Sequence, residues 1–466
     1  MSNLTLDYTN CLSDAIGATH GLTKSEVDTL VAKFPKHHEN VEELRSTGEC
    51  AFFDLPYQDL SELKGLLKKH QGKWENLVVV AIGGSSIGPR SLLNALGHGQ
   101  HNHLEAKERK NAPRVFFANN PDPRALSELV ETLDLKKTLF QVTSKSGLSV
   151  ETLAIWLWLS DVLKKKVGKS ALANQVVFTT DRDKSPLMEI AKQEKIDTLP
   201  VPTNLPGRYG VLGNTGLFAA GLCNIDIAKL LAGAGEMDKR CRHGDAFKNP
   251  AYMHALVHYL LTRKRRKTIH VMFSFSNRVH SVGEWYSHLC AVSQGKMLNR
   301  KGKAVHVGPS PVAALGTFDQ HGQMQLFCEG PFDKVVTFVT VKDHGAKISA
   351  PAAAYPKLEA VQHLQNADFT TIMDYGYWGT EQHITAAGRP NMTIQLDVVD
   401  EANIGGLYYL LELSTAMSAE LYGIDPFDQP GVEHCKQATF AQFGRAGFED
   451  LSNRIRDYRA KPRKTC

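Results

Sequence analysis

The 466-residue sequence predicts an α/β protein with two parallel β-sheets, each covered by helices. Two observations predict this fold. First, several short apolar runs lack polar alternation, which is typical of strands buried on both faces of a parallel sheet. Second, segments with helical periodicity separate these runs, as in βα units. The composition, 42% hydrophobic and 22% charged, indicates a globular chain that can bury a large core.

The expected strands fall into two sets along the chain. They are Leu77–Ile82, Arg114–Ala118, Thr138–Thr143 and Val176–Thr180, followed by Ile269–Phe275, Val335–Val341 and Met392–Asp397. Helices are expected between strands of the first set, over Pro123–Leu135 and Val150–Lys166. The sequence therefore predicts four segments: a helical N-terminal segment (1–70), two α/β domains (71–230 and 250–430) and a helical C-terminal tail (431–466).

Charge and cysteine content exclude several classes of protein. The net charge is only +5, and the densest basic run, Arg263–Lys267, is interpreted as a solvated connection between a helix and a strand rather than a nucleic-acid site. The eight cysteines form no CxxC pair, which favours free thiols in a reducing compartment. The start of the chain lacks the features of a signal peptide, and no apolar run approaches the ~20 residues of a membrane span. We expect a cytoplasmic protein without nucleic-acid or membrane partners.

Hydroxyl-rich loops follow two strands of the first set. The run LVVVAI leads into GGSSIGP, which contains Ser85, and TLFQVT leads into SKSGLSVET, which contains Ser144, Ser146 and Ser149. Ligands of open α/β sheets bind at the carboxyl ends of the strands, and a helix N-terminus beside hydroxyls suits an anion. The sequence predicts a phosphate site here, with Lys145 nearby. The alternative is that these serines only form turns and cap a helix.

At this point the motifs resemble those of the glucose-6-phosphate isomerase family. The similar strings are AIGGSSIGP, SKSGLSVET, PGRYGVLGNTG, GTFDQHGQMQ and YGIDPFDQPGVEHCK, which occur in this order between residues 81 and 436. The resemblance implies two α/β/α sandwich domains of the sugar-isomerase type. It also implies a homodimer that needs no cofactor or metal and acts in glycolysis and gluconeogenesis.

The resemblance assigns roles to particular residues. Ser85, Ser144, Ser146 and Ser149 would hold the sugar phosphate, and Gly84, Lys145, Glu151 and Gln429 would be further substrate contacts. His321, reaching across from the partner subunit, would open the sugar ring together with Lys436. Arg208 would stabilise the enediol intermediate, because a guanidinium keeps its charge and offers several donors.

One residue departs from the family pattern. The family carries its proton-transferring base in a string of the form E-S-x-G-K, and the matching string here is Val292-Ser293-Gln294-Gly295-Lys296. Valine cannot accept a proton. Among possible substitutes, Glu284 is expected to miss the substrate, nothing aims His434 at it, and His288 is interpreted as an exposed or core histidine.

Three functions follow from this departure. The first is an isomerase that interconverts glucose 6-phosphate and fructose 6-phosphate through ring opening and a cis-enediol, but slowly, since loss of a general base removes ~10²–10⁴ in rate. The second is a sugar-phosphate-binding protein of the same fold with little or no turnover. The third is a related ketose/aldose isomerase that uses another base.

Overall fold

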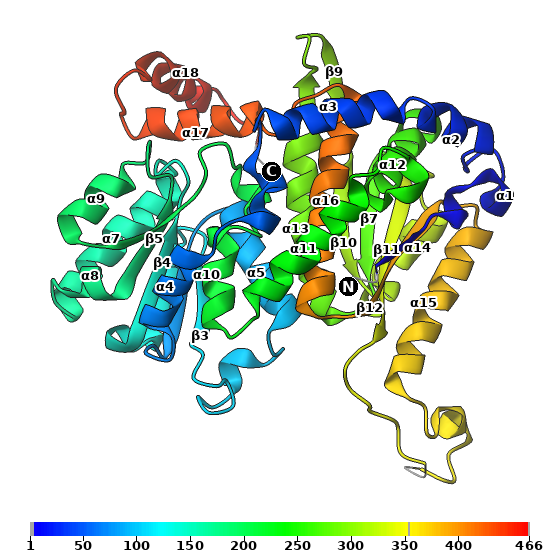
Figure 1. The fold of residues 1–466 in the computed structure, drawn as a ribbon, viewed down its shortest axis with the longest axis horizontal. Helices are drawn as coiled ribbons and strands as arrows, with labels where there is room; N and C mark the ends of the chain where they lie inside the picture. The colour runs from blue at the N-terminus through cyan, green and yellow to red at the C-terminus, as the bar shows by residue number, and fades with distance from the viewer. Residues whose placement is uncertain (1–3, 353–354, 465–466) are drawn as a thin grey trace. The chain divides into compact units, whose positions relative to one another are not determined.

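The computed structural model describes residues 4–352 and 355–464, and its architecture is the predicted α/β fold (Figure 1). The chain divides into two compact units, each with one five-stranded sheet. Unit 1 contains the described residues of Met1–Glu75, Gly83–Arg114 and Asn204–Pro426, and unit 2 contains those of Asn76–Ile82, Val115–Thr203 and Phe427–Cys466. The four continuous segments proposed from the sequence stay a prediction.

The sheet of unit 1 has the strand order β1-β12-β11-β7-β10. Strands β7, β10, β11 and β12 run parallel, and β1 pairs antiparallel with β12. The strands are β1 (Thr5–Asp7), β7 (Ile269–Ser274), β10 (Ser310–Leu315), β11 (Lys334–Asp343) and β12 (Asn391–Val398), beside a small hairpin of β8 (Lys296–Leu298) and β9 (Ala304–Val307). The first eight residues of β11 are all buried, as expected for a strand with helices on both faces.

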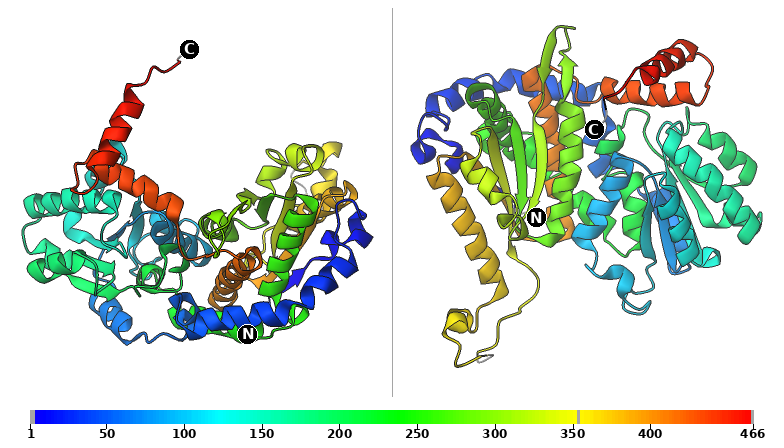
Figure 2. Two further views of the ribbon diagram at one scale, coloured as in Figure 1. Left: turned by 90° about the horizontal axis from the view of Figure 1, so that it is seen from above. Right: turned by 180° about the vertical axis from the view of Figure 1, so that it is seen from behind.

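Helices cover both faces of this sheet (Figures 1 and 2). The helices of unit 1 are α1 (Ser13–Ile16), α2 (Lys24–Val31), α3 (Phe34–Ser46), α4 (Ser61–His70), α5 (Gly84–Leu96), α10 (Asn214–Leu222), α11 (Ile227–Cys241), α12 (Pro250–Arg265), α13 (Asn277–Gln294), α14 (Met324–Glu329), α15 (Phe369–Ala386) and α16 (Glu401–Tyr422). On one face, Phe327 of α14 and Tyr377 of α15 pack against Phe273 and Phe338 of the sheet. This core holds β7 and β11 in place, and β7 leads directly into α13.

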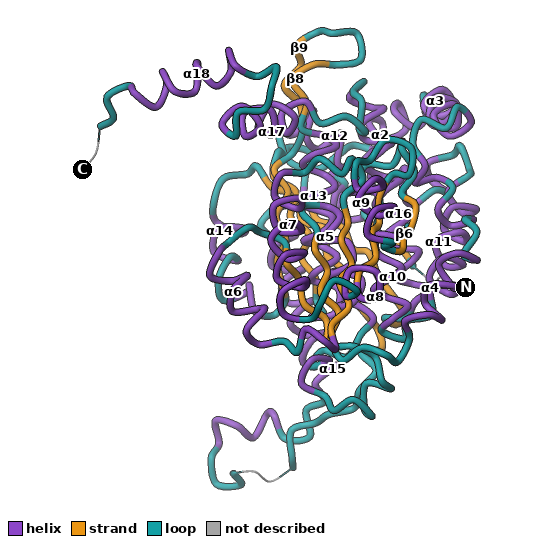
Figure 3. The backbone as a smooth tube through the Cα atoms, turned by 90° about the vertical axis from the view of Figure 1, so that its left-hand side faces the viewer, coloured by secondary structure: helices purple, strands orange, loops and turns teal. Residues whose placement is uncertain are grey.

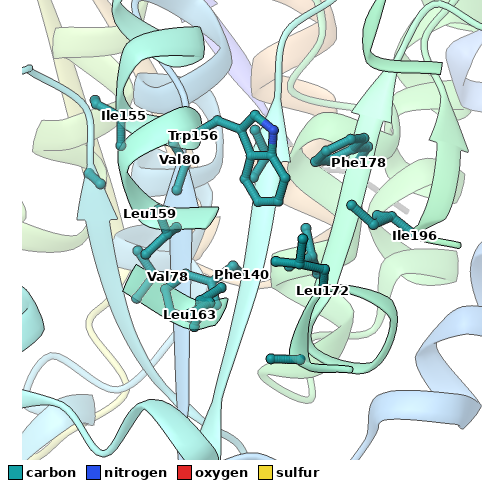
Figure 4. Packing of buried hydrophobic residues seen from close by; sticks show 14 of the residues in the cluster. Val78, Val80, Phe140, Ile155, Trp156, Leu159, Leu163, Leu172, Phe178 and Ile196 are labelled. Atoms are coloured by element: carbon teal, nitrogen blue, oxygen red, sulfur yellow. The ribbon is translucent and has the colours of Figure 1, made fainter. Parts of the chain in front are cut away.

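The sheet of unit 2 has the strand order β3-β2-β4-β5-β6. Its elements are β2 (Asn76–Val80), β3 (Arg114–Ala118), α6 (Pro123–Thr132), β4 (Thr138–Thr143), α7 (Val150–Lys166), α8 (Ala171–Gln175), β5 (Val176–Thr180), α9 (Leu187–Glu194), β6 (Asp197–Pro200), α17 (Pro430–Gln442) and α18 (Glu449–Ala460). Figure 3 shows these strands behind the helices α6, α7, α8 and α9. Figure 4 shows the core beneath them, where Trp156 meets Phe178 edge to face at 4.9 Å.

The structure confirms all seven expected strands and both expected helices, to within one or two residues for the strands and three for the helices. The interpretation of Arg263–Lys267 is only half right. The run does join α12 to β7, but Lys267 is 1% exposed, and its ammonium group donates to the carbonyl of Phe332 at 2.6 Å. Lys267 lies two residues before β7, and its side chain is buried because its ammonium group satisfies a loop carbonyl there.

Candidate active site

The serine-rich loop of unit 2 connects β4 to α7 and is held rigidly. Ser144 is buried, and its carbonyl accepts a hydrogen bond from the Thr180 hydroxyl at 2.6 Å. Gly147 has φ +63°, and a Cβ there would lie 2.1 Å from the Ser185 hydroxyl, so only glycine fits. Ser149 is the N-cap residue of α7, yet its hydroxyl makes no capping hydrogen bond. The loop thus presents hydroxyls beside a helix N-terminus, an arrangement that suits an anion.

A second group of polar side chains in unit 2 centres on Glu433 of α17. Gln429 and Lys436 both donate to its Oε1, over 2.9 and 2.7 Å. Burial raises the pKa of Glu433. Hydrogen bonds from Lys436 and Gln429, together with the charges of Lys436 and Lys145, lower it by more, so the net pKa lies below its usual value. Lys145 also donates to the carbonyl of Thr203 at 3.1 Å. Glu433 therefore stays ionised and fixes the lysine that the sequence analysis had singled out.

In unit 1, two glycines allow the start of α5 to contact the segment that carries Arg208. A Cβ on Gly84 would lie 2.5 Å from the Cα and nitrogen of Arg208, and one on Gly207 would lie 2.8 Å from the Ser85 hydroxyl. Real Cβ atoms do not approach backbone this closely. The two glycines therefore bring the predicted phosphate ligand Ser85 beside the predicted enediol ligand Arg208.

The guanidinium of Arg208 is buried and oriented by two hydrogen bonds. Its Nε donates to the Ser293 hydroxyl at 2.8 Å, and its Nη2 donates to the carbonyl of Pro426 at 2.6 Å. Ser293 lies at the end of α13, while Pro426 precedes the FDQPGVEHCK motif. A fixed cation of this kind can stabilise negative charge without reorganising.

The predicted base position, Val292, directly precedes the residue that contacts this arginine. Val292 is half-buried in the last turn of α13, directly before Ser293, and its carbonyl accepts a hydrogen bond from Lys296 at 2.8 Å. Glu284, two turns earlier, forms an ion pair with Arg90 at 3.5 Å. His288 lies between them, one turn before Val292, and is exposed rather than packed in the core.

His321 follows the 3-10 turn η8 (Phe318–Gln320) and is exposed. The turn is well fixed, since Asp319 accepts from the amide of Leu315 at 2.7 Å and Gln320 donates to the carbonyl of Gly376 at 2.7 Å. Within the described chain, the imidazole of His321 makes no hydrogen bond or ion pair. The histidine is therefore presented to solvent on a rigid support.

Each unit thus gathers part of the predicted site. Unit 1 brings together Gly84, Ser85, Arg208 and Val292, and unit 2 contains Ser144, Lys145, Ser146, Ser149, Glu151, Gln429 and Lys436. Sequence reasoning missed the roles of Glu433 and Ser293. Their spacing was informative: Glu433 is three residues before Lys436, a helical neighbour, and Ser293 adjoins the base position.

Within residues 4–352 and 355–464, no group of three or more histidine, cysteine, aspartate or glutamate side chains is placed to hold a metal ion. In the same residues, no helix has the length and apolar character to cross a membrane.

Comparisons with known proteins agree with this fold. A statistical model of the family described as phosphoglucose isomerase matches residues 62–444. The glucose-6-phosphate isomerase of Carboxydothermus hydrogenoformans is 36% identical over 445 residues, which cover 95% of each chain. That of Rubrobacter xylanophilus is 37% identical over 80% of this chain and 83% of its own.

Two solved structures superimpose closely on the chain. A hypothetical protein from Thermus thermophilus has a TM-score of 0.83 at 27% identity and covers 95% of this chain and 100% of its own. The glucose-6-phosphate isomerase of Chlamydia trachomatis has a TM-score of 0.81 at 18% identity over 98% of this chain and 92% of its own, which shows the shared fold. The fold is therefore that of a solved glucose-6-phosphate isomerase. The chain belongs to the phosphoglucose isomerase family.

Proposed function

We propose that this chain interconverts glucose 6-phosphate and fructose 6-phosphate, and that it does so slowly. The relatives of similar length named glucose-6-phosphate isomerase support the reaction. The observation that carries the proposal is the orientation of Arg208 by Ser293, directly beside the position of Val292. An oriented guanidinium with no adjacent carboxylate at that position can bind and polarise the sugar but lacks the usual proton acceptor.

Binding of the phosphate is assigned to the hydroxyl-rich loops. Ser144, Ser146 and Ser149 at the N-terminus of α7 would take the phosphate together with Ser85. Gly84, Lys145, Glu151 and Gln429 would be the remaining contacts with the sugar. Serine hydroxyls and helix amides bind a phosphate dianion strongly because charge-assisted hydrogen bonds exceed neutral ones.

Ring opening and enediolate formation are assigned to three side chains. Lys436, held by Glu433, and His321 would move protons at the ring oxygen and the C1 hydroxyl. Arg208 would stabilise the negative charge that develops on O1 when the C2 proton leaves. The remaining step, carriage of that proton from C2 to C1, has no carboxylate at position 292. The second candidate function, a sugar-phosphate-binding protein without turnover, rests on the same valine.

A homodimer is part of the proposal. Phe318, Tyr375 and Trp378 expose 76%, 64% and 53% of their surface on η8 and α15. Large aromatic side chains exposed together mark an interaction surface. A second copy of this chain that covers this surface would receive His321, which follows Phe318 closely in sequence. The cytoplasmic location and a role in glycolysis and gluconeogenesis complete the proposal.

A coupled assay of fructose 6-phosphate isomerisation tests the function, with calorimetric titration of the same ligand. We expect binding by the natural chain, slow turnover, and a gain of ~10²-fold or more in Val292→Glu. Val361→Glu, which places the same charge at a half-buried valine of η9 (Glu359–Leu364), is the control and leaves turnover unchanged. If the chain binds the ligand but does not turn it over, the non-catalytic function replaces the proposed one.

A further inference from the structure

The face of α13 that contains Val292 carries two ionisable side chains, Glu284 and His288. Glu284, His288 and Val292 follow one another at four-residue intervals on α13. Residues with this spacing lie on the same face, with Cβ atoms ~6 Å apart. A helical side chain leans toward the N-terminus and covers the turn before its own Cα. A carboxylate at position 292 would therefore reach into the space beside His288.

His288 is in a suitable state to accept a proton. It is exposed, and neither ring nitrogen forms a hydrogen bond within the described chain. Although solvent reaches the ring, desolvation by the surrounding protein and the nearby charge of Arg90 lower the pKa of His288, while Glu284 raises it in part, so the net pKa lies below the ordinary 6.5. The imidazole is therefore neutral at pH 7. A neutral imidazole with a pKa near the working pH is the usual form of a general base.

The surroundings connect this histidine to the site. Arg90 lies on α5, whose first turn contains Ser85, and its guanidinium is 3.5 Å from the carboxylate of Glu284. Ser293, immediately after Val292, orients Arg208. His288 thus lies little more than one turn before Ser293, the residue that orients Arg208, and on the same helix, α13, as Val292.

We propose that His288 is the catalytic residue that carries the proton between C2 and C1 in this chain. The inference rests on the proposed isomerase function. In the step from aldose to enediol, the C2–H bond breaks and its proton binds an imidazole nitrogen. The bonding pair forms the C1–C2 double bond, and the carbonyl electrons move to O1 beside Arg208. The imidazolium then gives its proton to C1, the O2 proton passes to O1, and the ketose forms with neutral His288 restored.

The test compares turnover of the natural chain with His288→Gln, Val292→Glu and the double variant. We expect His288→Gln to reduce kcat ~10²-fold or more, with KM changed less than about threefold. The double variant should keep the kcat of Val292→Glu within about tenfold, because the carboxylate then carries the proton. His280→Gln, two turns earlier on α13, is the matched control and should leave kcat unchanged.

A pH profile separates a base from a structural histidine. The kcat of the natural chain should fall on acidification with a midpoint below about 6.5, and Val292→Glu should move this limb to lower pH. The inference alone is overturned if His288→Gln keeps the turnover of the unsubstituted chain, and the proposed function survives that result. If the unsubstituted chain has no turnover while Val292→Glu is active, the inference falls and the binding protein without turnover replaces the slow isomerase. Absence of turnover in Val292→Glu would instead remove the proposed function, and this inference with it.

Discussion

The Nε of Arg208 donates to the hydroxyl of Ser293 at 2.8 Å, and Ser293 directly follows Val292 at the end of α13. The chain therefore keeps the support of its buried cation one residue away from a position that cannot take part in proton transfer. The buried guanidinium can keep its place without a carboxylate at position 292 because the two residues lie on separate elements, Arg208 on η6 (Gly207–Tyr209) and Val292 on α13.

Removal of this support should affect chemistry more than binding. In the Val292→Glu background, Ser293→Ala leaves Arg208 without its Nε acceptor, and we expect kcat to fall on the order of tenfold to a hundredfold with a smaller change in KM. Steady-state kinetics measure both. The control is Ser287→Ala on the same helix, whose hydroxyl bonds only to the carbonyl of Gly283. Equal losses in the two variants would contradict the role of Ser293.

Alanine substitutions at two glycines should distinguish an effect on stability from an effect on phosphate binding. Gly84→Ala meets the backbone of Arg208 at 2.5 Å and should destabilise unit 1 by several degrees in Tm, whereas Gly207→Ala meets only the movable Ser85 hydroxyl at 2.8 Å. The second variant should fold and bind fructose 6-phosphate about tenfold more weakly. Gly65→Ala in α4, with nothing within 4 Å, is the control and should stabilise slightly. Tight binding by Gly207→Ala would exclude Ser85 from the phosphate site.

Three neighbouring buried histidines should make unit 1 sensitive to acid. His254, His258 and His270 are buried, with ring centroids 4.4 and 4.2 Å apart in succession. Burial lowers the pKa of His254 to about 3. The unfolded chain then binds more protons below pH 6.5, so stability is full above that pH and declines as pH falls toward 3.

Each such histidine should remove about 1 kcal/mol from the free energy of unfolding between pH 6.5 and 5.5. Urea titrations of unit 1 fluorescence at these two pH values measure the change. His254→Gln cannot titrate but can still bond to Ser414. In this variant the free energy of unfolding should fall by about 1 kcal/mol less between the two pH values. An unchanged slope in that variant would show that His254 titrates normally in the folded chain.

The contribution of His321 across a dimer can be tested by mixing. In the Val292→Glu background, Arg208→Ala and His321→Ala should each be inactive alone. If His321 serves the partner's site, random reassociation of the two variants restores about a quarter of the sites, since half the dimers are mixed and each has one intact site. No recovery in a mixture that sedimentation shows to exchange subunits would place His321 in its own chain's site, or outside the site.

The sequence predicted the parallel sheets well because buried strands such as Thr138–Thr143 are continuously apolar. It did not predict β10 (Ser310–Leu315), whose pattern GPSPVAAL contains two prolines and small residues typical of a loop. This segment forms a strand because it pairs with β7, and pairing with a segment distant in the sequence cannot be seen in the local pattern. For the same reason, Val292 could be recognised from its motif, but the exposure of His288 and the ion pair of Glu284 required the folded helix.

We propose that the sugar-phosphate site of this chain lacks only its carboxylate. The most direct test is the kcat for fructose 6-phosphate of the natural chain against that of Val292→Glu. We expect slow turnover in the first and a gain of ~10²-fold or more in the second. Full-speed turnover by the natural chain, with no gain in the variant, would contradict it, because position 292 would then have no part in moving the proton.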